Sequence, residues 1–142
     1  MGELRGALFV DANVFLRYLT NDVPEQAEAV ESLFRDAADG HACLVTNVMV
    51  LAELVRVMES QYRLSKQEVH RRALAVATME GLDLPGLDLV VQALFDYLEK
   101  NVDFIDAYNV AWAGHRAIDT IVTFDSRHLG RFPGLTVVTP GT

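Results

Sequence analysis

Cysteine is almost absent from this chain, and lysine is scarce. Cys43 is the only cysteine among 142 residues, so no internal disulfide and no cysteine cluster for zinc is available. Its apolar neighbours predict that Cys43 is a small buried residue of a strand rather than a reactive thiol. The two lysines, Lys66 and Lys100, both lie in segments that we expect to be helical. Neither lysine is therefore expected at the end of a strand.

Long apolar runs are also missing. No run approaches the roughly 20 residues needed to span a bilayer. The N-terminal segment MGELRGALFVD has an apolar stretch shorter than the roughly 7–15 residues of a signal peptide. We therefore expect a cytoplasmic protein without a membrane span. With 51% apolar and 23% charged residues, the chain is not of the disordered class, and its length fits a single domain, 1–142.

The chain lacks basic excess, since its formal net charge is −8. Taken alone, this argues against nucleic acid as a partner, because phosphate binding is usually accompanied by a basic surface. Net charge describes the long-range field, however, and not one cleft. An acidic cluster filled by divalent cations can still receive a phosphate, because the bound metal reverses the local sign of the charge.

Strand and helix patterns alternate along the chain. We expect strands at 7–10, 42–46, 120–124 and 135–138, with a short ambiguous one at 81–84. We expect a helix at 13–20, a second that Pro24 opens and that ends before Gly40, and a third from a Thr46 or Asn47 cap to about Tyr62. Further helices are expected after the capping box at 65–68, at 87–98 and after an Asp103 cap. This alternation predicts an α/β fold with a central, mainly parallel sheet covered by helices on both faces. Ligands in such folds bind beyond the carboxyl ends of the strands.

Two aspartates follow apolar strands at that edge. Asp11 ends the run ALFV, and it could either cap the next helix or take part in chemistry, since Asn13 could also cap. Asp125 ends the run TIVTF, where it could cap a turn or serve a site.

The other acidic candidates lie in helices. Glu53 is the only charge in the block VMVLAELV, so we expect a buried carboxylate that needs Arg56, a proton or a metal to compensate it. Asp103 and Asp106 stand three residues apart at a helix start, where Asp103 can cap and Asp106 can favour the helix dipole. The same spacing also places both side chains near one face.

Four carboxylates on different elements, each beside apolar sequence, favour a cation site over four separate structural roles. Carboxylates that cluster repel one another unless cations lie between them, and oxygen ligands suit Mg²⁺ or Mn²⁺ better than zinc. A bound ion of this kind activates water and neutralises charge on a phosphorus centre, which is the chemistry of phosphodiester hydrolysis. None of the four histidines shows metal-ligand spacing; His128, close to Asp125, is the one nearest to a catalytic role.

The chain resembles the PIN-domain ribonucleases and, within them, the VapC-type toxins of toxin–antitoxin pairs. The matching segments, in family order, are FVDAN at 9–13, AEL at 52–54, DFIDA at 103–107 and VTFD at 122–125. The resemblance implies a three-layer α/β/α sandwich and Mg²⁺- or Mn²⁺-dependent endoribonuclease activity on RNA. It also implies a homodimer and a small antitoxin protein as partners.

The same resemblance assigns roles to individual residues. The catalytic and metal-binding quartet would be Asp11, Glu53, Asp106 and Asp125. The accessory residues would be Asp103, Asn13 and Thr46. The segment after Asp125 varies within the family, so Asp125 has the weakest match of the quartet.

The sequence argues against two other classes of phosphate-binding protein and leaves two alternatives within the PIN family. A haloacid-dehalogenase-type phosphatase also has an aspartate after its first strand. Such a phosphatase needs a second aspartate two residues after the first, where this chain has Asn13. It also needs a lysine near the end of a later strand, whereas Lys66 and Lys100 both lie in segments expected to be helical. No dinucleotide-binding or P-loop motif occurs. A housekeeping RNA-processing PIN nuclease and a non-catalytic PIN scaffold remain as alternatives to a toxin.

Overall fold

The computed structural model describes residues 6–141, which form two compact units that divide between Leu87 and Asp88. Residues 1–5 of the segment considered above as a signal peptide lie outside the described residues. Within residues 6–141, none of the helices has both the length and the apolar character needed to cross a bilayer.

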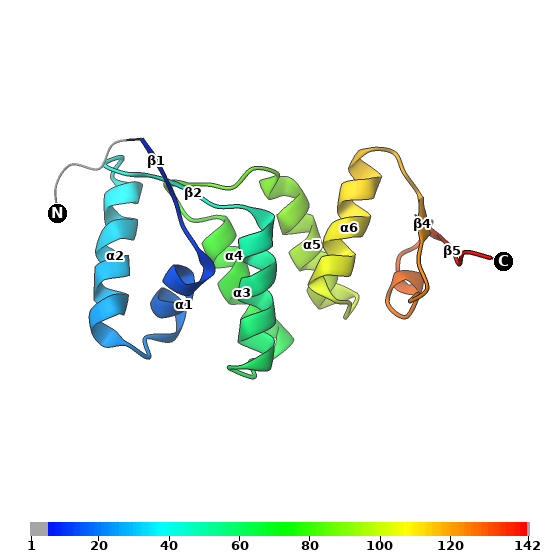
Figure 1. Cartoon of the computed structure of the whole chain (residues 1–142), viewed down its shortest axis with the longest axis horizontal. Helices are drawn as coiled ribbons and strands as arrows, with labels where there is room; N and C mark the ends of the chain where they lie inside the picture. Colours follow the sequence, from blue (N-terminus) through cyan, green and yellow to red (C-terminus); the bar gives the residue numbers. More distant parts are fainter. Residues whose placement is uncertain (1–5, 142) are drawn as a thin grey trace. The chain divides into compact units, whose positions relative to one another are not determined.

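The first unit consists of three strands and four helices (Figure 1). Their order is β1 (Ala7–Phe9), α1 (Ala12–Thr20), α2 (Pro24–Ala38), β2 (Cys43–Val45), α3 (Val48–Ser60), α4 (Lys66–Ala77) and β3 (Leu82–Asp83). The strands form a parallel sheet in the order β1-β2-β3, with Leu44 opposite Leu8 on one side and Leu82 on the other. Parallel pairing brings the carboxyl ends of β1 and β2 to the same edge, as the sequence predicts.

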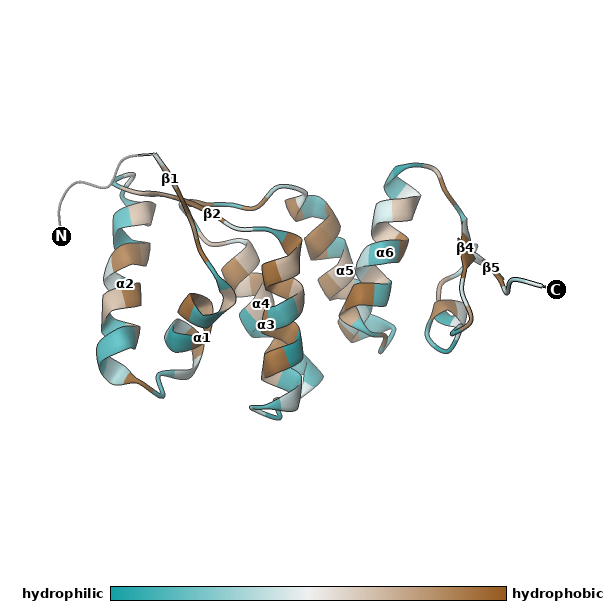
Figure 2. Cartoon of the chain, viewed as in Figure 1, coloured by the Kyte–Doolittle hydropathy of each residue, from teal (hydrophilic) through white to brown (hydrophobic). Residues whose placement is uncertain are grey.

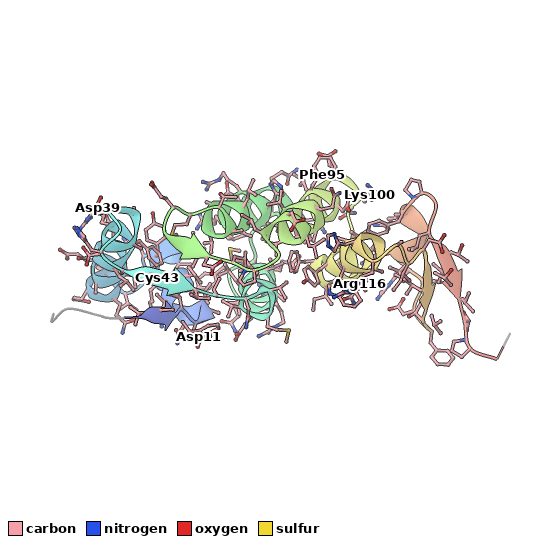
Figure 3. The ribbon with its side chains drawn as sticks, turned by 90° about the horizontal axis from the view of Figure 1, so that it is seen from above. Asp11, Asp39, Cys43, Phe95, Lys100 and Arg116 are labelled. Atoms are coloured by element: carbon pink, nitrogen blue, oxygen red, sulfur yellow. The ribbon has the colours of Figure 1, made fainter. Side chains whose placement is uncertain are left out.

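Side chains of this sheet alternate between a buried and an exposed face. Leu44 is fully buried, and Leu8 and Leu82 beside it are half-buried. Phe9 and Cys43 lie at the alternate positions and are exposed. The predicted burial of Cys43 is therefore wrong, because a residue next to Leu44 in a strand must point to the opposite face. Figure 3 labels Cys43 on β2.

Local capping signals explain where the helices of the first unit begin. Asn47 caps α3, and its Oδ1 accepts a hydrogen bond from the amide of Val50 at 3.2 Å, which decides between Thr46 and Asn47. Ser65 caps α4 as predicted. Helix α1 packs against α2 and α3, and α3 packs against α4. Figure 2 shows apolar and polar residues alternating around α2 and α3, as expected for helices that bury one side.

One glycine governs the entry to β3. Gly81 has φ of +86°, and a Cβ there would lie 2.4 Å from the carbonyl oxygen of Ala37 in α2. Only glycine fits this conformation and this close approach without a shift of the backbone.

The second unit consists of two α-helices, two strands and a short 3₁₀ helix. The order is α5 (Leu87–Glu99), α6 (Phe104–His115), β4 (Thr120–Val122), η1 (Leu129–Arg131) and β5 (Thr136–Val138). Strands β4 and β5 are parallel, with Ile121 opposite Val137. The 3₁₀ helix was not predicted, and its Leu129 is buried.

A partly buried ion pair stabilises the end of α5. Asp96 is 5% exposed, and its carboxylate accepts hydrogen bonds from Lys100 Nζ at 2.9 Å and from Gln92 Nε2 at 3.2 Å. Arg131 of η1 donates to the carbonyl oxygens of Lys100 and Asn101, just after α5. The segment that follows β4 is thus attached to the end of α5. Figure 3 labels Lys100 at this end of the helix.

The predicted α/β fold with mainly parallel strands is confirmed, since every strand pair among the described residues is parallel. These strands belong to two sheets, one in each unit.

Candidate functional site

Asp11 lies where β1 leads into α1 (Figure 3). It is the N-cap of α1, and its Oδ1 accepts a hydrogen bond from the amide of Ala12 at 2.8 Å. Its Oδ2 makes no hydrogen bond to any residue in the range 6–141. The capping role and a chemical role are therefore compatible, because one oxygen of this exposed carboxylate is left for a ligand.

Thr46 holds the backbone next to Asp11. Its side chain is 1% exposed, and its Oγ1 donates to the carbonyl oxygen of Val10 at 3.0 Å. The hydroxyl therefore ties the end of β2 to the residue that precedes Asp11. This contact agrees with the supporting role that the resemblance implies for Thr46. Asn13 is exposed in the first turn of α1 and lines a groove between α1 and α2.

Glu53 is exposed, so the prediction of a buried carboxylate is wrong. Its neighbours Leu51 and Leu54 are fully buried, but Met49, Glu53 and Arg56 follow one another at helical spacing on the exposed face of α3. No ion pair joins Glu53 to Arg56 in the described part of the chain. Its carboxylate remains available, although not for the reason first inferred.

In the second unit, Asp103 and Asp106 lie at the start of α6. Asp103 is the N-cap, and its Oδ2 accepts hydrogen bonds from the amides of Ile105 and Asp106 at 3.0 and 3.3 Å. Asp106 is half-buried, and its Oδ2 lies 3.6 Å from Nδ1 of His128. The capping role predicted for Asp103 is confirmed, and a histidine from the segment after β4 joins the two acids.

The electrostatic surroundings of Asp106 raise its pKa above the usual value for an aspartate. Partial burial is the largest cause, the negative charge of Asp103 is the next contributor that raises it, and Asp125 raises it further. His128 acts in the opposite direction when its ring is protonated. The charges of Asp103 and Asp125 thus both oppose the ionisation of Asp106, which is a situation that a cation would relieve.

Asp125 lies in the turn after β4 and is well exposed. Its amide donates to Thr123 Oγ1 at 3.0 Å, and its Oδ1 accepts from the amide of Arg127 at 3.2 Å. The Arg127 guanidinium lies 3.3 Å from Oδ2 of Asp125. Asp125 is therefore held both by its turn and by an arginine that carries the opposite charge.

The structure brings together Asp103, Asp106, Asp125 and His128 in the second unit, while Asp11, Glu53, Asn13 and Thr46 belong to the first. Across residues 6–141, no three Asp, Glu, His or Cys side chains come close enough to hold a metal ion. This does not conflict with the raised pKa of Asp106, because Coulombic effects act over longer distances than metal coordination does.

Three arginines close to Asp11 or Asp125 in the sequence have local partners. Arg17 donates from Nε to Gln26 at 2.7 Å, Arg127 lies on Asp125, and Arg131 binds the carbonyls after α5. The contacts of His128 with Asp103 and Asp106 were not predicted from the sequence. The closeness of His128 to Asp125 in the chain was the only available signal.

Comparisons with known proteins gave two findings. A family model described as "PIN domain" matches residues 8–135. A similar solved structure is that of VapC20 from Mycobacterium tuberculosis, described as a sarcin–ricin loop cleaving toxin; it is 20% identical, and the match covers 88% of this chain and 94% of that chain at a TM-score of 0.35. At this TM-score the likeness supports no argument about the present chain. No curated protein matches the sequence.

Proposed function

Because this chain belongs to the PIN-domain family, whose members are nucleases, we propose that it is an endoribonuclease that hydrolyses RNA phosphodiester bonds with Mg²⁺ or Mn²⁺. The observation that carries the proposal is Asp106 at the start of α6, whose pKa is raised by partial burial and by the negative charges of Asp103 and Asp125. Such an arrangement destabilises the protein unless a cation or a proton compensates it.

A hard divalent ion fits the chemistry of these donors. The candidates offer carboxylate oxygens and no thiolate, and oxygen ligands suit Mg²⁺ and Mn²⁺. We propose that Asp11, Glu53, Asp106 and Asp125 hold the ion, with Asp103, Asn13 and Thr46 in support. We propose that residues 1–142 form one PIN domain.

The chain's own residues would then divide the work. When bound, the ion supplies positive charge that favours ionisation of water and offsets negative charge developing on the phosphate. Asp106 must be ionised to act as a ligand, so its raised pKa makes it a sensitive member of the set. Thr46 holds the backbone beside Asp11, and the carboxylates can accept the proton that the attacking water loses.

Cleavage of RNA by matched variants tests the proposal. The loss of a metal's contribution removes several kcal/mol of transition-state stabilisation, and about 3 kcal/mol corresponds to about a hundredfold in rate. We expect Asp106→Asn, Asp11→Asn and Glu53→Gln each to lower Mn²⁺-dependent cleavage by about a hundredfold or more. Asp88→Asn, an exposed aspartate in the first turn of α5, is the matched control and should cleave as the wild type does. Wild-type rates in Asp106→Asn would refute the proposed site.

We further propose that the nuclease is the toxin of a VapBC-type pair, a cytoplasmic homodimer that a small antitoxin protein inhibits. The support is the set of four motifs in family order within a chain of 142 residues. Expression of the wild type should arrest growth, and Asp11→Asn should not. A short neighbouring reading frame should relieve the arrest when co-expressed. A housekeeping nuclease would tolerate expression and would have no such neighbour.

Metal binding without RNA separates an enzyme from a non-catalytic scaffold. Ligand at 100 times its dissociation constant stabilises the folded state by about 2.7 kcal/mol. A thermal melt in Mn²⁺ should therefore shift upward by several degrees for the wild type, and a scaffold without a site would show no shift.

A further inference from the structure

The amide N–H of Asp103 donates to a side chain from outside its own helix. In a capping box, the N-cap side chain accepts the amide of the third helical residue, whose own side chain accepts the N-cap amide in return. Here the first half is present, because Asp103 Oδ2 accepts from the amide of Asp106 at 3.3 Å. The second half is not, because the Asp103 amide donates to Nδ1 of His128 at 3.1 Å.

Asp106 occupies the position that would normally complete this capping box. Its carboxylate accepts no hydrogen bond from the backbone within residues 6–141. Its Oδ2 lies 3.6 Å from Nδ1 of His128, which is too long for a hydrogen bond. Since Nδ1 accepts the Asp103 amide, it carries no proton towards Asp106, and the ring proton lies on Nε2.

We propose that His128 is a positioning residue for the nuclease: it accepts the Asp103 amide in place of Asp106 and so leaves both Asp106 oxygens free for a cation. The inference rests on the proposed function. The same hydrogen bond also attaches the turn that contains Asp125 to the start of α6. One acceptor atom on His128 therefore orders two of the proposed ligands.

The residues that follow His128 are ordered by burial and by backbone contacts. Leu129, the next residue, is 5% exposed, and Phe132 is 7% exposed. Between them, Arg131 donates to the carbonyl oxygens at the end of α5. These contacts fix the backbone that carries His128, so its ring is presented from an ordered segment.

Substitutions at His128 separate this role from proton transfer. In histidine Nδ1 is bonded to Cγ, as Oδ1 is in asparagine, so His128→Asn keeps an acceptor at that position. His128→Gln places its amide further from the backbone, and His128→Ala has no acceptor. His115→Ala changes an exposed histidine at the other end of α6 and serves as the matched control.

The expected result is a defect in metal affinity rather than in maximal rate. Loss of a residue that orients a metal ligand typically weakens metal binding by about 10- to 100-fold. His128→Ala and His128→Gln should raise the apparent Mn²⁺ dissociation constant by about tenfold, measured by thermal shift and by cleavage, and should approach the wild-type rate at saturating Mn²⁺. His128→Asn should stay within about twofold of the wild type, and His115→Ala should be unchanged.

Nuclear magnetic resonance of the metal-free protein gives a readout that needs no activity. An N–H···N hydrogen bond transmits a scalar coupling between its two nitrogens, so ¹⁵N-labelled wild type should show coupling between the Asp103 amide and His128 Nδ1. Absence of the coupling would overturn the proposal, and so would a His128→Asn defect as large as that of His128→Ala. Equal Mn²⁺ affinity in all variants would also overturn it. If the coupling and the Mn²⁺ pattern are found but wild type does not cleave RNA, the proposed function fails while the positioning role stands.

Discussion

We predict that Lys100→Met destabilises the protein more than Asp96→Asn does, although each removes one partner of the same ion pair. The asymmetry follows from burial. The Asp96 side chain is 7% exposed, whereas that of Lys100 is 29% exposed. After loss of the lysine, the buried carboxylate keeps the neutral donor Gln92, but no other cation pairs with it among residues 6–141. After loss of the carboxylate, the lysine can extend its charge into water.

The magnitudes follow from these exposures. Removal of one partner from a fully buried pair costs about 3–5 kcal/mol. Water can approach the Lys100 side, so we take about 2 kcal/mol for Lys100→Met. Loss of the ammonium over the Phe132 ring, 5.7 Å from its centroid, adds about 0.5 kcal/mol. Asp96→Asn keeps the shape and an acceptor oxygen, so its cost is about 1 kcal/mol, the scale of one hydrogen bond.

Urea unfolding followed by circular dichroism measures these differences. The double variant with both Lys100→Met and Asp96→Asn should be less destabilised than Lys100→Met alone, because it contains no unpaired buried charge. Arg35→Met is the matched control: Arg35 pairs with Glu31 at the same i,i+4 spacing and 2.8 Å, but both side chains are more than half exposed. Its cost should stay below about 0.5 kcal/mol. The reasoning is refuted if Asp96→Asn costs as much as Lys100→Met, or if the double variant is the least stable.

Three further predictions concern other parts of the chain. Gly81→Ala should lower the free energy of unfolding, measured in urea, by about 2 kcal/mol or more, because Gly81 has a positive φ and a Cβ there would meet Ala37. Gly86→Ala, which has a positive φ but open space around the Cβ, should cost about 1 kcal/mol. Equal costs for the two variants would contradict the role of the contact with Ala37. Asn47→Ala should cost about 1 kcal/mol through loss of the α3 cap, and an unchanged urea midpoint would exclude that role. The raised pKa of Asp106 means that the folded chain holds this proton more tightly than the unfolded chain, so without metal the protein should gain stability as pH falls through the raised pKa. In thermal melts at a series of pH values, Asp106→Asn should lack this gain in stability at low pH. A melting temperature that changes with pH in parallel for the variant and the wild type would count against the prediction.

Local signals allowed most of the elements to be predicted from the sequence. Pro24 opens α2, Ser65 caps α4 and Asp103 caps α6, as their positions indicate. Each of these signals depends on residues within one helical turn. The parallel pairing follows from the alternation of strands and helices, which permits few other connections.

The errors arose where a side chain's environment depends on tertiary packing. The block around Glu53 is apolar in composition, and Met49 conceals the exposed stripe, because a methionine that is 74% exposed reads as a core residue. The exposure of Cys43 depends on which face of the sheet is covered. The contact between His128 and Asp103 joins residues 25 positions apart, and no periodicity in the sequence encodes it. Whether Asp11 and Glu53 share a site with Asp106 and Asp125 stays a prediction.

The incomplete capping box at the start of α6 has a practical consequence for work with the proposed toxin. Because the backbone of α6 relies on Asp103 and His128 and not on the Asp106 side chain, a neutral residue at 106 should leave the fold intact. Asp106→Asn should therefore be tolerated by the expressing cell, purify as a folded chain and hold uncleaved RNA. Position 106 is thus the one at which the proposed activity can be removed while the helix start is retained.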